Sequence, residues 1–68
     1  MKKISITLNG EERSVEASSM VALLEELGLP ISTVLVEQNG LALLRHELEK
    51  APLTEGDQIE ILKVVAGG

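Results

Sequence analysis

Apolar and polar residues alternate over residues 4–8, where two isoleucines and a leucine are separated by a serine and a threonine. A period of two is typical of a β-strand with one buried face. Asn9-Gly10 follows, and this dipeptide favours a type I′ turn because both central residues of that turn need positive φ. A two-residue loop would place Ile4 opposite Val15 and Lys3 opposite Glu16, and both pairs are favourable. The sequence therefore predicts an antiparallel hairpin at the start of the chain.

The spacing becomes helical after Ser19. Four apolar residues then recur on one stripe: Met20, Leu23, Leu24 and Leu27. The hydroxyl of Ser19 suits an N-cap, because it can accept from an unpaired backbone N–H of the first turn. Gly28 suits the left-handed position that ends a helix, and Pro30 prevents the helix from resuming. We expect one amphipathic helix whose apolar stripe faces the core.

The second half of the chain predicts three more strands. Residues 31–37 form the first, with Val34 and Val36 on one face and Leu35 on the other. Asn39-Gly40 is a second tight turn. It leads into a short strand at residues 41–44.

A polar stretch at residues 45–50 follows that short strand and reads as a turn or a single helical turn. Residues 51–57 are a loop with turn chemistry at its end. Residues 58–65 predict the final strand, in which Ile59 and Ile61 alternate with polar residues.

One helix can cover only one face of one sheet. We therefore expect an α+β domain over residues 1–65, with a mixed sheet of four to five strands and the helix packed on one face. Residues 66–68 would be a flexible tail. Leu62 and Val64 would project from the uncovered face near that tail, joined by Leu35 and Leu43. Such apolar residues predict a partner-binding surface, the alternative being that loops at the sheet edge cover them.

Composition narrows the possible functions. The chain has 68 residues, a net charge of −5, no cysteine and no aromatic residue. An acidic chain without aromatic side chains is a poor nucleic-acid binder, whereas a basic protein partner fits its charge. No apolar stretch is long enough to span a bilayer and none resembles a signal peptide, so we expect a soluble, cytoplasmic protein without membrane attachment.

No candidate catalytic or metal site emerges from the pattern. His46 is the only histidine, and no second strong ligand stands at a defined spacing from it. The neighbouring pairs Glu11-Glu12 and Glu25-Glu26 do not suggest a pocket, and a glycine loop that could hold phosphate is missing. We expect no metal, no bound cofactor and no catalytic residue, so the chain is predicted not to be an enzyme.

The last residues offer a different chemistry. The final strand runs into Val64-Val65-Ala66-Gly67-Gly68. Two glycines are not held by side-chain packing, and they leave the terminal carboxylate unobstructed. Residues 65–68 could reach about 13 Å into a narrow active-site channel. Gly68 is therefore a candidate substrate group for another enzyme, and a frayed end without a role is the alternative.

The order of these features resembles a family. The two Asn-Gly turns, the helix with Leu23-Leu24-Glu25-Glu26-Leu27, the segment Pro52-Leu53-Thr54-Glu55-Gly56-Asp57 and the Gly-Gly end are together similar to the ThiS family of ubiquitin-like sulfur carriers. The resemblance implies the β-grasp fold, with parallel first and last strands at its centre. The chain departs from the family where members often have a proline near Leu44-Arg45 and an aromatic residue at the position of Leu48.

The resemblance also implies a role for the tail. An E1-like adenylating enzyme of the ThiF type would use ATP to activate the carboxylate of Gly68, and sulfur would displace AMP to give a thiocarboxylate. Ala66, Gly67 and Gly68 would enter the partner's active site. A sulfur donor such as a cysteine desulfurase would supply the sulfur, and a ThiG-type thiazole synthase would consume it in thiamin biosynthesis. The alternatives are a sulfur carrier of molybdopterin synthesis, a ubiquitin-like protein modifier and an interaction module with an inert tail.

Overall fold

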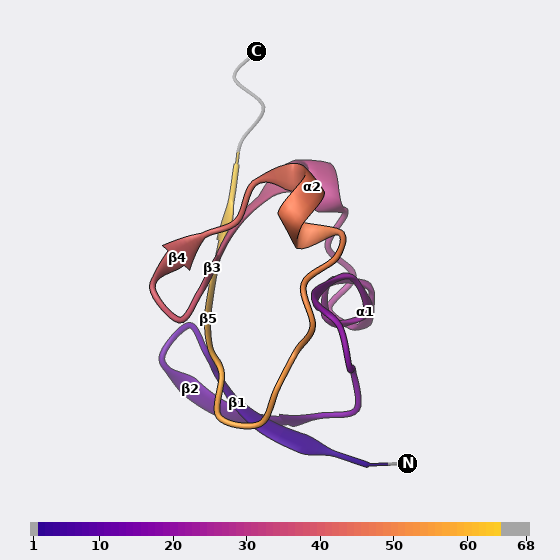
Figure 1. Ribbon diagram of the computed structural model, residues 1–68, viewed down its shortest axis with the longest axis vertical. Helices are drawn as coiled ribbons and strands as arrows, with labels where there is room; N and C mark the ends of the chain where they lie inside the picture. The colour runs from indigo at the N-terminus through magenta and orange to yellow at the C-terminus, as the bar shows by residue number, and fades with distance from the viewer. Residues whose placement is uncertain (1, 65–68) are drawn as a thin grey trace.

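The structure is a computed structural model, and it describes residues 2–64. Its elements follow one another in the order β1 (Ile4–Leu8), β2 (Glu11–Val15), α1 (Met20–Glu26), a 3₁₀ turn (Ile31–Thr33), β3 (Val34–Gln38), β4 (Leu41–Ala42), α2 (Arg45–Leu48) and β5 (Gln58–Lys63). Figure 1 shows that α1 and α2 lie on the same side of the strands. The other side of the sheet, called here the uncovered face, carries no helix.

The five strands form one mixed sheet in the order β2-β1-β5-β3-β4. β5, the last strand in the sequence, is therefore the central strand in space. It runs parallel to β1 and antiparallel to β3. The expected mixed sheet with parallel first and last strands is confirmed, and the α+β class with it.

The first hairpin has the predicted register. Ile4 pairs with Val15, and the pairing continues to Leu8 and Glu11 beside the turn. Asn9 and Gly10 both have positive φ, at 49° and 83°. These values are those of a type I′ turn, whose twist matches that of the two strands that it joins.

Helix α1 begins and ends as the sequence predicts. The hydroxyl of Ser19 accepts a hydrogen bond from the N–H of Ala22 at 3.1 Å. At the other end Gly28 has a φ of 72°. The N–H of Leu29 donates to the carbonyl of Leu24, and that of Gly28 to the carbonyl of Glu25. This is the Schellman arrangement, which satisfies carbonyls that would otherwise lack a partner.

The predicted boundaries of the later strands need correction. Residues 31–33 form a 3₁₀ turn instead of the first part of β3. The carbonyl of Pro30 accepts from both the N–H and the hydroxyl of Thr33, at 3.0 Å and 2.7 Å. Such local bonds compete with the pairing of an extended strand.

β4 and β5 are also shorter than predicted. β4 ends at Ala42, because the chain turns there toward α2, where the carboxylate of Glu47 accepts from the N–H of Leu44. β5 ends at Lys63. The polar stretch at residues 45–50 contains the single helical turn α2.

The core lies between the sheet and the two helices. It contains the stripe of α1 and the inward-facing residues of β1, β3 and β5, together with Leu48 and Leu53. Ile6, Met20, Leu23 and Ile59 are at most 1% exposed. Leu48, one of the expected departures from the family pattern, is buried. Aliphatic side chains alone thus close the core of the described residues.

Two further expectations concern the tail and membrane attachment. The division between a domain of residues 1–65 and a tail of residues 66–68 falls outside the described residues and stays a prediction. In the part of the chain that the structure describes, none of the helices has the length and apolar character needed to cross a membrane.

Candidate functional site

The uncovered face becomes apolar toward the end of β5. Leu62 of β5 pairs directly with Leu35 of β3, and the two side chains are 62% and 60% exposed. Val64, just beyond β5, is 45% exposed. These three residues are called here the leucine patch. Large apolar side chains that gather in this way are typical of an interaction site.

Leu43 contributes to this region from a different position. It is half-buried and packs against the core, and its N–H donates to the carbonyl of Val36 at 2.9 Å. It still lines, with Leu35 and Leu62, a hollow of about 120 Å³. The sequence pattern missed two exposed leucines nearby, Leu41 and Leu44. The signal for them was the unbroken apolar run of residues 41–44.

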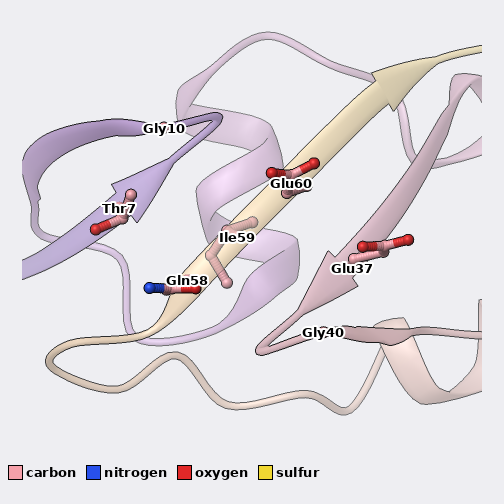
Figure 2. A pocket seen from close by; sticks show the side chains of 7 residues that line it. All are labelled: Thr7, Gly10, Glu37, Gly40, Gln58, Ile59 and Glu60. Atoms are coloured by element: carbon pink, nitrogen blue, oxygen red, sulfur yellow. The ribbon is translucent and has the colours of Figure 1, made fainter.

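A second hollow lies on the uncovered face between the two Asn-Gly turns, and its volume is about 350 Å³. Figure 2 shows Gly10 on one side of it, Gly40 on the other and β5 between them. It is called here the inter-turn hollow. Its lining residues are Thr7, Gly10, Glu37, Gly40, Gln58, Ile59 and Glu60.

Two carboxylates stand next to each other on this hollow. Glu37 of β3 pairs directly with Glu60 of β5, and both side chains are exposed (Figure 2). Like charges at directly opposed positions of a sheet are destabilising. Strand neighbours on the same face do not offset this repulsion, because none of them is basic: Thr7, Gln58, Leu35, Leu62 and Ala42.

The two Asn-Gly turns hold β5 from both sides. The side-chain amide of Asn9 accepts from the N–H of Ile61 at 2.8 Å and donates to its carbonyl at 3.3 Å. Asn39 accepts from the N–H of Gln58 at 2.8 Å. β1 pairs with β5 only as far as Ile59, so the amide of Asn9 extends the ladder by two residues toward the leucine patch. Sequence reasoning assigned both asparagines to turns and missed this second role.

Asp57 fixes the loop that leads into β5. Its carboxylate accepts from the side chains of Gln38 and Asn39 and from the N–H of Thr54, at 2.8 to 3.0 Å. Burial by itself would raise the pKa of Asp57. The hydrogen bonds from Asn39, Thr54 and Gln38 outweigh burial and hold the pKa below its usual value. The starting point of the strand that ends in the leucine patch is therefore fixed at both physiological and mildly acidic pH.

The predicted tail residues Ala66, Gly67 and Gly68 lie outside the described residues. His46 is exposed on α2. Within residues 2–64, acidic and histidine side chains do not gather into a group of three that could hold a metal ion.

Comparison with known proteins identifies the family of this chain. The model of the ThiS family matches residues 6–68, which is almost the whole chain. The chain belongs to the ThiS family. A sulfur carrier protein ThiS from Thermus thermophilus is 36% identical over 63 residues, which cover 93% of this chain and 98% of that protein.

Solved structures of the family share the fold. A crystal structure of a thiamine biosynthesis protein (ThiS) from Geobacter metallireducens superposes with a TM-score of 0.80. It is 29% identical, and the match covers 96% of this chain and all of that one. A solution structure of a thiamine biosynthesis protein from the same organism gives a TM-score of 0.77 at the same identity. The expected ubiquitin-like β-grasp fold is therefore confirmed.

One relative is much longer than this ThiS-family chain. A thiazole synthase from Paramagnetospirillum magneticum is 36% identical over 66 residues. The match covers 96% of this chain but only 20% of that protein. A segment similar to the entire domain thus lies inside a thiazole synthase polypeptide.

Proposed function

We propose that the chain is a sulfur carrier of thiamin biosynthesis and that the carboxylate of Gly68 is its working group. The observation that carries this proposal is the family match over residues 6–68, which extends through the Gly-Gly end. The relative from Thermus thermophilus, which bears the name sulfur carrier protein ThiS, matches over nearly its whole length. In this role the chain is a protein cosubstrate, and the catalytic groups belong to its partners.

The chemistry follows from the poor reactivity of a carboxylate toward nucleophiles. An oxygen of the Gly68 carboxylate attacks the α-phosphorus of ATP, pyrophosphate leaves, and an acyl adenylate forms. A sulfur nucleophile then attacks the carbonyl carbon and AMP leaves. When that nucleophile is the outer sulfur of a persulfide on the donor, a thiol then attacks the donor sulfur, a disulfide forms there, and Gly68 is left with a thiocarboxylate. ATP binds to the adenylating partner, and this chain needs no bound cofactor of its own.

Three kinds of partner are required for this cycle. An E1-like adenylating enzyme of the ThiF type activates the tail, and a donor such as a cysteine desulfurase supplies sulfur. A ThiG-type thiazole synthase accepts the sulfur, and the similarity to part of a thiazole synthase polypeptide supports this third partner. The leucine patch lies on the strand that leads to the tail. The globular body would dock through Leu35, Leu62 and Val64, with Leu43 at the side, while the last residues enter the active site.

The experiment is a chemical test of Gly68. The chain is incubated with cell extract, ATP and a sulfur source, treated with an alkylating reagent and fragmented in a mass spectrometer. Because the chain has no cysteine, a thiocarboxylate is the sulfur nucleophile expected to react first. We expect a C-terminal fragment in which Gly68 carries one sulfur in place of oxygen and is alkylated. Fragmentation is necessary because oxidation of either methionine, Met1 or Met20, changes the intact mass by nearly the same amount.

The matched control is a chain that lacks Gly68. It keeps every described residue, and it should remain unmodified in the same extract. An unmodified wild-type tail, in an extract that thiolates a known carrier, would contradict the proposal. Sulfur uptake by both the wild-type and the shortened chain at another position would contradict it as well.

A further inference from the structure

The pattern of the uncovered face along β3 and β5 suggests what covers it. Two rows of directly opposed residues follow each other toward the end of β5. The first row is acidic, with Glu37 opposite Glu60, and the second is apolar, with Leu35 opposite Leu62. The rows lie two positions apart along each strand, a distance of about 7 Å. All four side chains are exposed.

Both rows are unfavourable in the isolated chain. The leucines keep more than half of their surface in water. The carboxylates repel each other at directly opposed positions, and their strand neighbours on this face are neutral. A single partner surface relieves both costs if it brings a cation to the first row and an apolar side chain to the second. Arginine suits the first row, because its guanidinium can donate to two carboxylates at once.

The inter-turn hollow leaves room for such a side chain. Its two sides are formed by Gly10 and Gly40, which have no side chains, and its volume is about 350 Å³ (Figure 2). An ideal Cβ at either glycine would have no atom within 4 Å, so the approach from both turns is open. Thr7 and Gln58 add polar groups beside the two carboxylates.

We propose that the acidic and apolar rows together bind a thiazole synthase, which inserts a basic side chain between Glu37 and Glu60 and lays an apolar one on Leu35 and Leu62. This inference rests on the function proposed above, which already names thiazole synthase as a partner, and it adds the acidic row as the contact that recognises this partner. Thiazole synthase is chosen because a segment similar to this whole domain lies within such a polypeptide, so the two are made as one molecule in at least one organism. The charge of the carboxylates complements a basic surface, and the overall net charge of −5 favours the same encounter.

The test measures binding of the thiazole synthase from the same genome to the full chain by titration calorimetry. The variant combines Glu37→Gln with Glu60→Gln. Its matched control combines Glu25→Gln with Glu26→Gln on α1, on the other side of the sheet. Both variants change the net charge from −5 to −3. At about 50 mM salt we expect Kd to rise roughly tenfold or more for the first variant and less than about threefold for the control. At about 500 mM salt the difference between them should shrink, because the pair is exposed and screened.

Three results would overturn the inference. In the first, both variants weaken binding equally, which assigns the effect to net charge. In the second, neither changes Kd. In the third, the Glu37→Gln, Glu60→Gln variant weakens binding to the adenylating enzyme, measured in parallel, but leaves binding to thiazole synthase unchanged. A different protein would then cover the face. Far-UV circular dichroism of both variants checks that they fold, and we expect the Glu37→Gln, Glu60→Gln variant to unfold at an equal or higher denaturant concentration.

Failure of the proposed function would look different. If the wild-type chain does not become thiocarboxylated and does not bind thiazole synthase, both the proposed function and the inference that rests on it are wrong. If the wild-type chain does both and the Glu37→Gln, Glu60→Gln variant binds as tightly as wild type, the inference alone is wrong.

Discussion

Asp57 is a buried carboxylate whose charge is stabilised by neutral groups. Its partners are two side-chain amides, from Gln38 and Asn39, and one backbone N–H, from Thr54. Hydrogen bonds to a charged acceptor contribute more than bonds between neutral groups, and burial makes their loss costly. A single carboxylate therefore connects the β3–β4 turn with the loop that begins β5.

Asp57→Asn should destabilise the chain at pH 7 by about 1–3 kcal/mol, because an amide cannot accept from all three donors. The hydrogen bonds hold the pKa of Asp57 below its usual value of 3.8. The carboxylate's contribution is therefore present above pH 3.8 and is lost as the pH falls through the lower pKa of the folded state. The measurement is urea unfolding at several pH values, followed by circular dichroism because the chain has no aromatic residue.

The wild-type chain should lose its advantage over the Asp57→Asn variant as the pH is lowered below about 4. A difference in the free energy of unfolding that stays constant from pH 7 to pH 2 would contradict this account. The sequence predicted only a turn at Asp57. Its partners Gln38 and Asn39 lie 18 or more residues away in the sequence, and local patterns carry no information about such a contact.

At the scale of elements, the parts determined by local sequence could be predicted. The register of the first hairpin follows from the type I′ turn at Asn9-Gly10, and the ends of α1 follow from Ser19 and Gly28. The prediction of the strand boundary failed where the alternation of side chains is compatible with both a strand and a 3₁₀ turn. Residues 31–33 continue the pattern of β3, but Thr33 bonds back to Pro30 instead of a neighbouring strand.

The turn at Asn9 also positions an element that is distant in the sequence. Asn9→Ala should cost about 2–4 kcal/mol, because it removes two hydrogen bonds to Ile61 and places alanine, whose Cβ disfavours positive φ, in a left-handed conformation. Asn9→Gly tolerates the positive φ and should cost about 1–2 kcal/mol for the lost bonds. Denaturant unfolding gives the two energies, and hydrogen exchange should show a faster-exchanging Ile61 amide in both variants. An Asn9→Gly variant as stable as wild type, with an unchanged Ile61 amide, would show that the side-chain bonds contribute nothing.

At the scale of the whole molecule, β5 serves two purposes: one of its faces packs in the core, and the other forms part of the surface proposed for docking. Ile59 and Ile61 of β5 face the core, and Glu60 and Leu62 face the uncovered side. The exposure of Leu62 and Leu35 could be predicted because a period of two determines both faces of a strand. The repulsion between Glu37 and Glu60 could not, because the pairing of β3 with β5 is a long-range contact between separate elements.

A pair of leucine variants separates the two purposes. Leu23 is fully buried, so Leu23→Ala should cost about 2–5 kcal/mol, the range for removing a core side chain. A domain of this length has a total stability of roughly 3–10 kcal/mol, so this variant should be partly unfolded or close to it. Leu62 is 62% exposed, and Leu62→Ala should change the free energy of unfolding by no more than about 0.5 kcal/mol.

The two variants should differ in the opposite way in function. Per folded molecule, Leu62→Ala should slow the thiocarboxylation of Gly68, and Leu23→Ala should not. Leu62→Ala removes a contact surface from a stable domain, so the rate of Gly68 thiocarboxylation at limiting adenylating enzyme should fall while the unfolding curve stays in place. Leu23→Ala should lose activity only in proportion to its unfolded fraction, and low temperature or mild osmolyte should restore it. If Leu62→Ala instead unfolds as readily as Leu23→Ala, Leu62 belongs to the core. If Leu62→Ala folds and reacts as the wild-type chain does, the leucine patch is not the docking surface for activation, and the tail is recognised without it.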